Sequence, residues 1–305
     1  MDMKKILLLI FTILTLSFSA NSVSIQELKL KVDEGNAEAQ CKLRRCKEDG
    51  IPQEVTDKEN STFAIIIANE NYRFIPPVPY AINDGEVLEQ YFINTIGLPT
   101  DHVNLYKDAS MKNIQEVFKY VENIAATFGE DLNLILYYSG HGIADEWSKN
   151  AMLIPVDGDA MVPESCYEVN RLISRLGSLG AGSVIVMFDA CFSGTERGDK
   201  NLVLSAGIRP RPNPLLPSGN MVIISASGSG ETAFPYEAGQ HGLFTYYLLK
   251  NLQDNEGDVT LGELCDYITA KVQLQSFGIY SKRQTPTVVV SPTLKKDWRD
   301  LKLTN

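Results

Sequence analysis

Two segments of the chain end in side chains that could do nucleophilic chemistry. The first, Ser183 to Gly194, is an apolar run that ends in an acid, Cys191 and a glycine turn. The second, Leu132 to Gly142, is an apolar run that ends in His141 between two glycines. An imidazole beside a thiol activates it as a nucleophile by taking its proton. The two segments therefore predict a base paired with a thiol.

Both apolar runs are expected to be buried strands. Each contains five or more consecutive β-branched, aliphatic or aromatic residues, a pattern typical of a strand covered on both faces. The reactive side chain follows just after each run. Open α/β sheets place their active sites at the carboxyl ends of neighbouring strands. If the two strands are neighbours, His141 and Cys191 face each other at one edge of the sheet.

Strands alternate with helices along the rest of the chain, which predicts an α/β fold with a mostly parallel sheet and helices on both faces. The other expected strands are Phe63–Asn69, His102–Tyr106, Met221–Ser227 and Thr285–Val290. The expected helices are Asn83–Gly97, Met111–Phe128 capped by Ser110, Glu164–Leu179, His241–Leu252 and Leu261–Val272. The remaining expected features are a short hairpin at Met152–Asp159 and a proline-rich loop at Thr195–Asn220.

Composition and charge limit the class of partner. The 305 residues are 44% hydrophobic and 22% charged, which is ordinary globular composition. A formal net charge of −10 and the lack of a basic stripe argue against nucleic acid as a partner. The same charge is compatible with cationic peptides.

The first part of the chain resembles a targeting segment. Lys4 and Lys5 precede an apolar run from Ile6 to Phe18, and small residues follow. The run is too short to span a bilayer comfortably. We expect residues 1–20 to be a signal peptide and the protein to be exported; an uncleaved anchor and a buried helix are the alternatives.

Residues 21–61 are expected to form a helical segment. Within it Asp33 to Gly50 resembles one unit of a Sel1-like helical repeat, but Lys47 stands where that family usually carries an aromatic residue. A single unit cannot bury its own apolar face. A helical pro-segment or an arm packed on the main domain is therefore the competing interpretation.

Cysteine usage is consistent with a reactive thiol. Export would expose the five cysteines to an oxidising compartment, and an odd count leaves at least one thiol unpaired. A nucleophilic Cys191 would have to be that thiol. The cysteines lack zinc spacing and the chain has only three histidines, so no metal or other cofactor is predicted.

Several motifs together resemble the caspase-like cysteine peptidases, on the metacaspase and bacterial side of that superfamily. They are YYSGHG and FDACFSG, the opening FAIIIANENY, AINDGEVL, SASGSGETAFPYEAGQHGLFTYYLLKNL and the closing RQTPTVVV. The resemblance covers about Thr62 to Pro292. It implies a caspase-like three-layer sandwich over residues 62–292 and leaves 293–305 as a tail.

The resemblance implies a role for each residue of the dyad. Cys191 would attack the scissile carbonyl as a thiolate, and His141 would take the thiol proton and later protonate the departing amine. The backbone N–H groups of Gly142 and Cys191 would form the oxyanion hole.

Specificity is expected to depend on acidic residues. Asp189 stands two positions before Cys191, so strand alternation places it on the same side as the thiol. Asp84 and Ser139 match pocket positions of metacaspase-like enzymes. The stretch Pro76 to Ala81 lacks the basic residues with which true caspases bind aspartate. Together these features predict cleavage after arginine or lysine.

Each of these assignments has a structural alternative. Asp84 could be a helix N-cap, Asp189 and Ser139 could stabilise local turns, and His241 is expected to be structural. The resemblance also implies calcium dependence, but the acids within reach follow no defensible ligand spacing. Those acids are Asp157, Asp159, Glu164 and Asp199.

Two classes of function stay open. The first is an exported endopeptidase, favoured as a monomer, that acts on peptide or protein substrates and cuts itself in the Thr195–Asn220 loop. Basic residues at which it could do so are Arg197, Lys200, Arg209 and Arg211. The second is a caspase-fold binding or regulatory protein without turnover. A peptidase of asparagine or wider specificity differs from the first only at the pocket.

Overall fold

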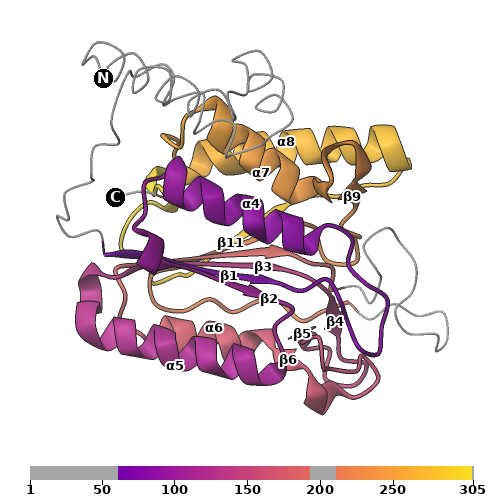
Figure 1. Cartoon of the computed structure of the whole chain (residues 1–305), viewed down its shortest axis with the longest axis horizontal. Coiled ribbons are helices and arrows are strands. Elements are labelled where there is room, and N and C mark those ends of the chain that lie inside the picture. Colours follow the sequence, from indigo (N-terminus) through magenta and orange to yellow (C-terminus); the bar gives the residue numbers. More distant parts are fainter. Residues whose placement is uncertain (1–60, 193–210, 304–305) are drawn as a thin grey trace, which may run out of the picture. The chain divides into compact units, whose positions relative to one another are not determined.

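A six-stranded sheet lies at the centre of the computed structural model (Figure 1). Its strands, in spatial order, are β11 (Thr287–Val290), β8 (Met221–Ser225), β7 (Ser183–Asp189), β3 (Asn133–Ser139), β1 (Thr62–Ala68) and β2 (Val103–Lys107). All neighbouring pairs are parallel except β11 with β8, which is antiparallel. The mostly parallel sheet predicted from the alternation of strands with helices is confirmed.

The structure describes residues 61–192 and 211–303. Several predictions therefore lie outside the described residues: the signal peptide at 1–20, the Sel1-like unit, Cys41, Cys46 and the basic residues Arg197, Lys200 and Arg209.

Helices cover both faces of the sheet (Figure 1). One face carries α4 (Ala81–Asn94), α7 (Leu243–Asp254) and α8 (Leu261–Tyr280), and the other carries α5 (Met111–Phe128) and α6 (Val169–Gly177). In α5 a capping box between Ser110 and Asn113 satisfies the first N–H groups, and a stripe of apolar residues faces the core. Within the described parts of the chain, no helix has the length and apolar character needed to cross a bilayer.

The strands of the central sheet are apolar on both faces because helices cover both. All seven residues of β1 and all seven of β7 are buried. Ile65, Ile66 and Ile67 are consecutive and each is at most 1% exposed, so neither face of β1 meets water. Each such side chain contributes about 1.5–3 kcal/mol on burial. The core therefore fixes the register of the strands that His141 and Cys191 follow.

Short strands form a rim beside the carboxyl ends of the main strands. β4 (Gly142–Ala144), β5 (Ala151–Leu153) and β6 (Tyr167–Glu168) make an antiparallel sheet, and β9 (Pro235–Tyr236) pairs with β10 (His241–Gly242). Turns of 3₁₀ helix occur at Thr100–His102, Gly129–Asp131, Pro163–Ser165, Glu237–Gly239 and Trp298–Asp300.

Two predicted helices differ from the structure by more than one helical turn at one end. The helix expected over Glu164–Leu179 is α6 alone, because Tyr167 and Glu168 pair with β5 before the helix begins. The helix expected to end at Val272 continues to Tyr280. Pairing with a distant strand is not visible in local periodicity, and this explains the first error.

Candidate active site

The register of β3 and β7 brings the two reactive segments together. Ser139 pairs with Asp189, so His141 and Cys191 each follow two residues after a directly paired position. The N–H of Gly140 donates to the carbonyl of Asp189 at 3.4 Å, which continues the contact past the strands. The imidazole and the thiol therefore lie on neighbouring loops at one edge of the sheet.

The imidazole of His141 is oriented by a backbone carbonyl. Its Nε2 lies 2.8 Å from the oxygen of Pro76. Because a carbonyl can only accept, Nε2 carries the proton and donates it, and this tautomer makes Nδ1 the nitrogen that accepts a proton. The ring of Tyr72 packs against the imidazole with centroids 4.8 Å apart.

Two tyrosine hydroxyls hold the backbone of His141. Its N–H donates to Tyr72 Oη at 2.8 Å, and Tyr138 Oη donates to its carbonyl at 2.7 Å. Burial raises the pKa of Tyr138 well above its usual range, so this hydroxyl stays a donor. A Cβ at Gly140 would lie 2.6 Å from Tyr72 Oη and 2.8 Å from Tyr138 Oη, which explains a glycine before the histidine.

The loop that supplies Tyr72 and Pro76 is itself anchored. Asn69 is fully buried, accepts from the N–H of Ala109 at 2.7 Å and donates to carbonyls of Ala109 and Ile154. The N–H groups of the next two residues, Glu70 and Asn71, donate to the carboxylate of Asp108. Sequence reasoning missed Tyr72 and Pro76 as neighbours of the histidine. The tyrosine in FAIIIANENY was the available signal.

The thiol of Cys191 is covered by the segment that follows β8. Cys191 is 4% exposed; the N–H of Ala233 donates to its Sγ at 2.6 Å, and Sγ donates to the carbonyl of Ala233 at 3.7 Å. An N–H directed at sulfur favours negative charge on it. A Cβ at Gly142 would lie 2.7 Å from the ring of Phe192 and 2.9 Å from the Cys191 carbonyl. A glycine is thus required where the two loops meet.

Two of the three predicted pocket residues are in direct contact, and the third lies beside them. Asp84 and Ser139 are fully buried, and Ser139 Oγ donates to Asp84 Oδ2 at 3.1 Å. Asp189 is the strand neighbour of Ser139. The N-cap of α4 is Tyr80, and Asp84 lies in its first turn, so the alternative of an N-cap for Asp84 is wrong.

Both acids also contact the start of α7. Asp84 Oδ1 lies 2.9 Å from Nδ1 of the buried His241 and accepts the N–H of Gly242 at 3.0 Å. Asp189 Oδ2 accepts from the hydroxyl of Thr245 at 2.6 Å. His241 and Thr245 were not recognised as neighbours of the pocket acids, because these contacts join residues far apart in the sequence.

The family model of the caspase domain (Peptidase_C14) matches residues 61–297. The chain belongs to the caspase domain family. The family is one of cysteine peptidases, so the coarse functional class follows from membership.

A solved structure has the same fold as this caspase domain. The crystal structure of caspase-1 from Spodoptera frugiperda aligns with a TM-score of 0.55 and 16% identity, over 79% of this chain and 93% of that one. At that identity the likeness concerns the fold alone. No curated protein matches the sequence.

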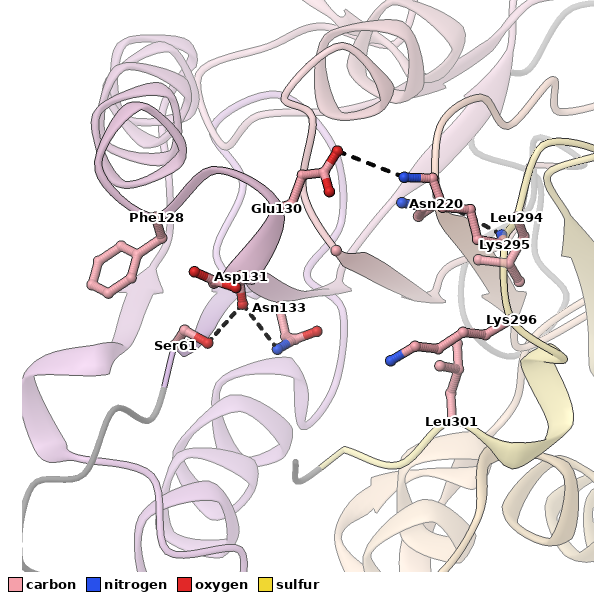
Figure 2. A pocket seen from close by; sticks show the side chains of 11 residues that line it. Ser61, Phe128, Glu130, Asp131, Asn133, Asn220, Leu294, Lys295, Lys296 and Leu301 are labelled. Atoms are coloured by element: carbon pink, nitrogen blue, oxygen red, sulfur yellow. Dashed lines mark hydrogen bonds and ion pairs between the residues drawn. The ribbon is translucent and has the colours of Figure 1, made fainter.

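A cavity of about 710 Å³ lies where the parallel strands begin, at the end of the sheet away from Cys191. Figure 2 shows side chains that line it. Ser61, Asn133, Gly182 and Asn220, which precede or begin β1, β3, β7 and β8, contribute to its wall. Strand β7 alone is about 20 Å long, so this cavity is separate from the Cys191 thiol.

Of the four acids considered for calcium, Asp157, Asp159 and Glu164 are described by the structure, and Asp199 lies outside the described residues. Asp157 accepts the N–H of Met111 and Asp159 accepts the N–H of Met161, both at 2.8 Å. In the described ranges no group of three or more His, Cys, Asp or Glu side chains has the geometry to hold a metal ion.

Proposed function

We propose that this caspase-domain protein is an exported cysteine endopeptidase that cuts after arginine or lysine. The observation that carries the proposal is the pairing of Ser139 with Asp189, which sets His141 and Cys191 on adjacent loops. An imidazole beside a thiol at the carboxyl ends of neighbouring parallel strands is the arrangement that nucleophilic catalysis needs.

The chemistry follows from the orientation of the imidazole. Nδ1 of His141 takes the proton of Cys191, and the thiolate attacks the scissile carbonyl. The resulting oxyanion is stabilised by N–H groups of Gly142 and Cys191, each worth about 3 kcal/mol in comparable sites. The imidazolium returns its proton to the departing amine as the C–N bond breaks. Water then hydrolyses the thioester and regenerates the thiol.

The acids beside the dyad support a basic specificity. Asp84, Ser139 and Asp189 gather at the same strand ends, and all three are fully buried. Two carboxylates in a low-dielectric site attract a cationic side chain far more strongly than a neutral one. An acidic side chain before the cut would be repelled.

The covered thiol supports activation by cleavage. Cys191 is 4% exposed, so a substrate must displace the segment that carries Ala233. The proposed self-processing after a basic residue between Thr195 and Asn220 would cut the chain in the segment that follows Cys191. The new chain ends would then be free to move away from the thiol. Export through residues 1–20 belongs to the same proposal and predicts a mature N-terminus near residue 21.

The same burial of Cys191 favours the second candidate, a caspase-fold binding protein without turnover. In that case the contact with Ala233 would be permanent and the thiol would never meet a peptide. Asparagine or wider specificity is a third outcome, which changes only the pocket.

Cleavage of fluorogenic peptides tests the proposal. The purified chain is assayed with peptides ending in arginine, lysine, aspartate or asparagine, with reductant and with or without calcium. Turnover of only the arginine and lysine peptides is expected. Cys191→Ala should abolish it and Cys265→Ala, the matched buried thiol, should retain it. Aspartate turnover would contradict the pocket, and silence on every peptide after processing would favour the binding protein.

A further inference from the structure

The carboxylate of Asp84 is held by donors from two other segments of the chain. Oδ1 faces Nδ1 of His241 at 2.9 Å and accepts the N–H of Gly242 at 3.0 Å, and Oδ2 accepts the hydroxyl of Ser139 at 3.1 Å. The side chains of Asp84 and His241 are 0% and 4% exposed. A buried carboxylate keeps its charge only when donors replace water around it.

The proton on the His241 ring can be placed. A carboxylate only accepts, so the contact with Asp84 requires the proton on Nδ1. Asn83 Nδ2 lies 3.4 Å from the same nitrogen and is itself a donor, but it donates to the Gln240 carbonyl at 2.8 Å. The shorter contact with the charged partner therefore determines the tautomer.

The second pocket acid is held by the same turn of chain. Asp189 Oδ2 accepts the hydroxyl of Thr245 at 2.6 Å. Since Thr245 has one proton and gives it to the carboxylate, Tyr137, 2.6 Å away, donates to Thr245. All three side chains are fully buried. Residues 241–245, at the start of α7, thus contact both acids that gather beside the dyad.

We infer that His241 and Thr245 are positioning residues that hold the carboxylates of Asp84 and Asp189 in place, aimed at a basic substrate side chain. The inference rests on the proposed function. Both residues donate to a carboxylate without requiring a charge of their own. Lysine or arginine at position 241 could also contact Asp84, but its fixed positive charge would cancel the attraction that the pocket offers to a substrate cation.

A selectivity measurement separates this role from a merely structural one. The kcat and KM of two peptides are compared, one ending in arginine and one in citrulline, its neutral isostere. His241→Leu should raise KM for the arginine peptide about tenfold, the effect of losing a hydrogen bond to a charged group, with little change in kcat or on citrulline. His241→Asn, which retains a donor, should restore the arginine preference to within about threefold.

Thr245 supplies a second pair of variants. Thr245→Val removes the donor to Asp189 at nearly constant volume and should lower the arginine preference, whereas Thr245→Ser should keep it. His102→Asn, a histidine that stacks on Phe63 at the amino end of β2, is the control for loss of an imidazole. Equal losses on both peptides in the Leu and Val variants would overturn the inference.

A spectroscopic measurement on the unchanged protein tests the contact itself. With only three histidines, ¹⁵N NMR can assign each ring. His241 should show the proton on Nδ1, and a neutral ring protonated on Nε2 would overturn the inference. If the wild-type chain cleaves no basic peptide, the proposed function fails and the inference fails with it. If it cleaves them with unchanged selectivity in the variants, the inference alone fails.

Discussion

His141 depends on Tyr72 for both its backbone and its ring. The Tyr72 hydroxyl accepts the His141 N–H at 2.8 Å, while its ring lies against the imidazole. Tyr72→Phe keeps the ring and removes the acceptor. A buried N–H left without a partner costs about 1–3 kcal/mol. We therefore expect kcat to fall about tenfold with KM little changed.

The control for this variant is Tyr120→Phe. Tyr120 also accepts from an amide, the side chain of Asn104 at 3.1 Å, but on α5. Its loss should leave peptide cleavage unchanged. Equal activity in the two variants would contradict the role given to Tyr72.

Two of the described thiols, Cys166 and Cys265, are buried where the thiolate form is disfavoured. Burial raises the pKa of Cys166 to about 11 and that of Cys265 to about 12. A raised thiol pKa means that the unreactive protonated form persists well above neutrality. At pH 8 iodoacetamide should leave both residues unmodified in the native protein and modify them rapidly in urea, as read by peptide mapping. Native labelling of Cys265 at pH 8 would show that its environment is not the one described.

The turn after β3 is packed too tightly to accept an added side-chain atom. The turn after β3 brings its backbone against two tyrosine hydroxyls, and a Cβ at Gly140 would meet both below 3 Å. We expect Gly140→Ala to destabilise the protein by about 1–3 kcal/mol and to lower kcat sharply. Gly278→Ala, on an exposed turn of α8 with open space around it, should stabilise the helix by up to about 1 kcal/mol. Urea unfolding of both variants checks the two signs, and equal effects would contradict the packing.

The strands, and the meeting of the His141 and Cys191 segments at one edge of the sheet, could be predicted because their signals are local. Apolar runs such as Phe63–Asn69 predict buried strands wherever they are placed, and the residues that follow them must lie at the sheet edge. The partners of those residues could not be predicted. His241 contacts Asp84 although the two residues are 157 positions apart, and the sequence around either residue contains no signal for that contact. The start of α6 was missed for the same reason, since β6 forms only against β5.

The whole molecule carries a net charge of −10, and its proposed substrates are cationic. Long-range attraction should therefore raise the rate of encounter with basic peptides at low ionic strength. We expect kcat/KM for an arginine peptide to fall several-fold between about 20 and 300 mM salt, more than for the citrulline peptide. An equal salt effect on both peptides would show that charge does not steer binding.

Self-processing is the second property of the whole chain that can be tested. Freshly purified wild-type protein should convert into two fragments by cleavage after a basic residue between Thr195 and Asn220. Cys191→Ala should remain one chain, and added wild-type enzyme should cut it at the same bond, as read by mass spectrometry. If the Cys191→Ala protein, without added wild-type enzyme, fragments as fast as the wild-type protein does, the cut is made by another peptidase.

Covalent labelling tests the nucleophile and the specificity together. A peptidyl-arginine chloromethyl ketone is incubated with the processed chain, and the modified residue is mapped beside the aspartyl analogue. We predict a thioether on Cys191 Sγ, formed as chloride leaves. The arginyl reagent should react at least tenfold faster than the aspartyl one, a discrimination of at least about 1.4 kcal/mol. His141→Ala should block the reaction with both reagents. Labelling of a different cysteine, or equal rates for the two reagents, would contradict the account.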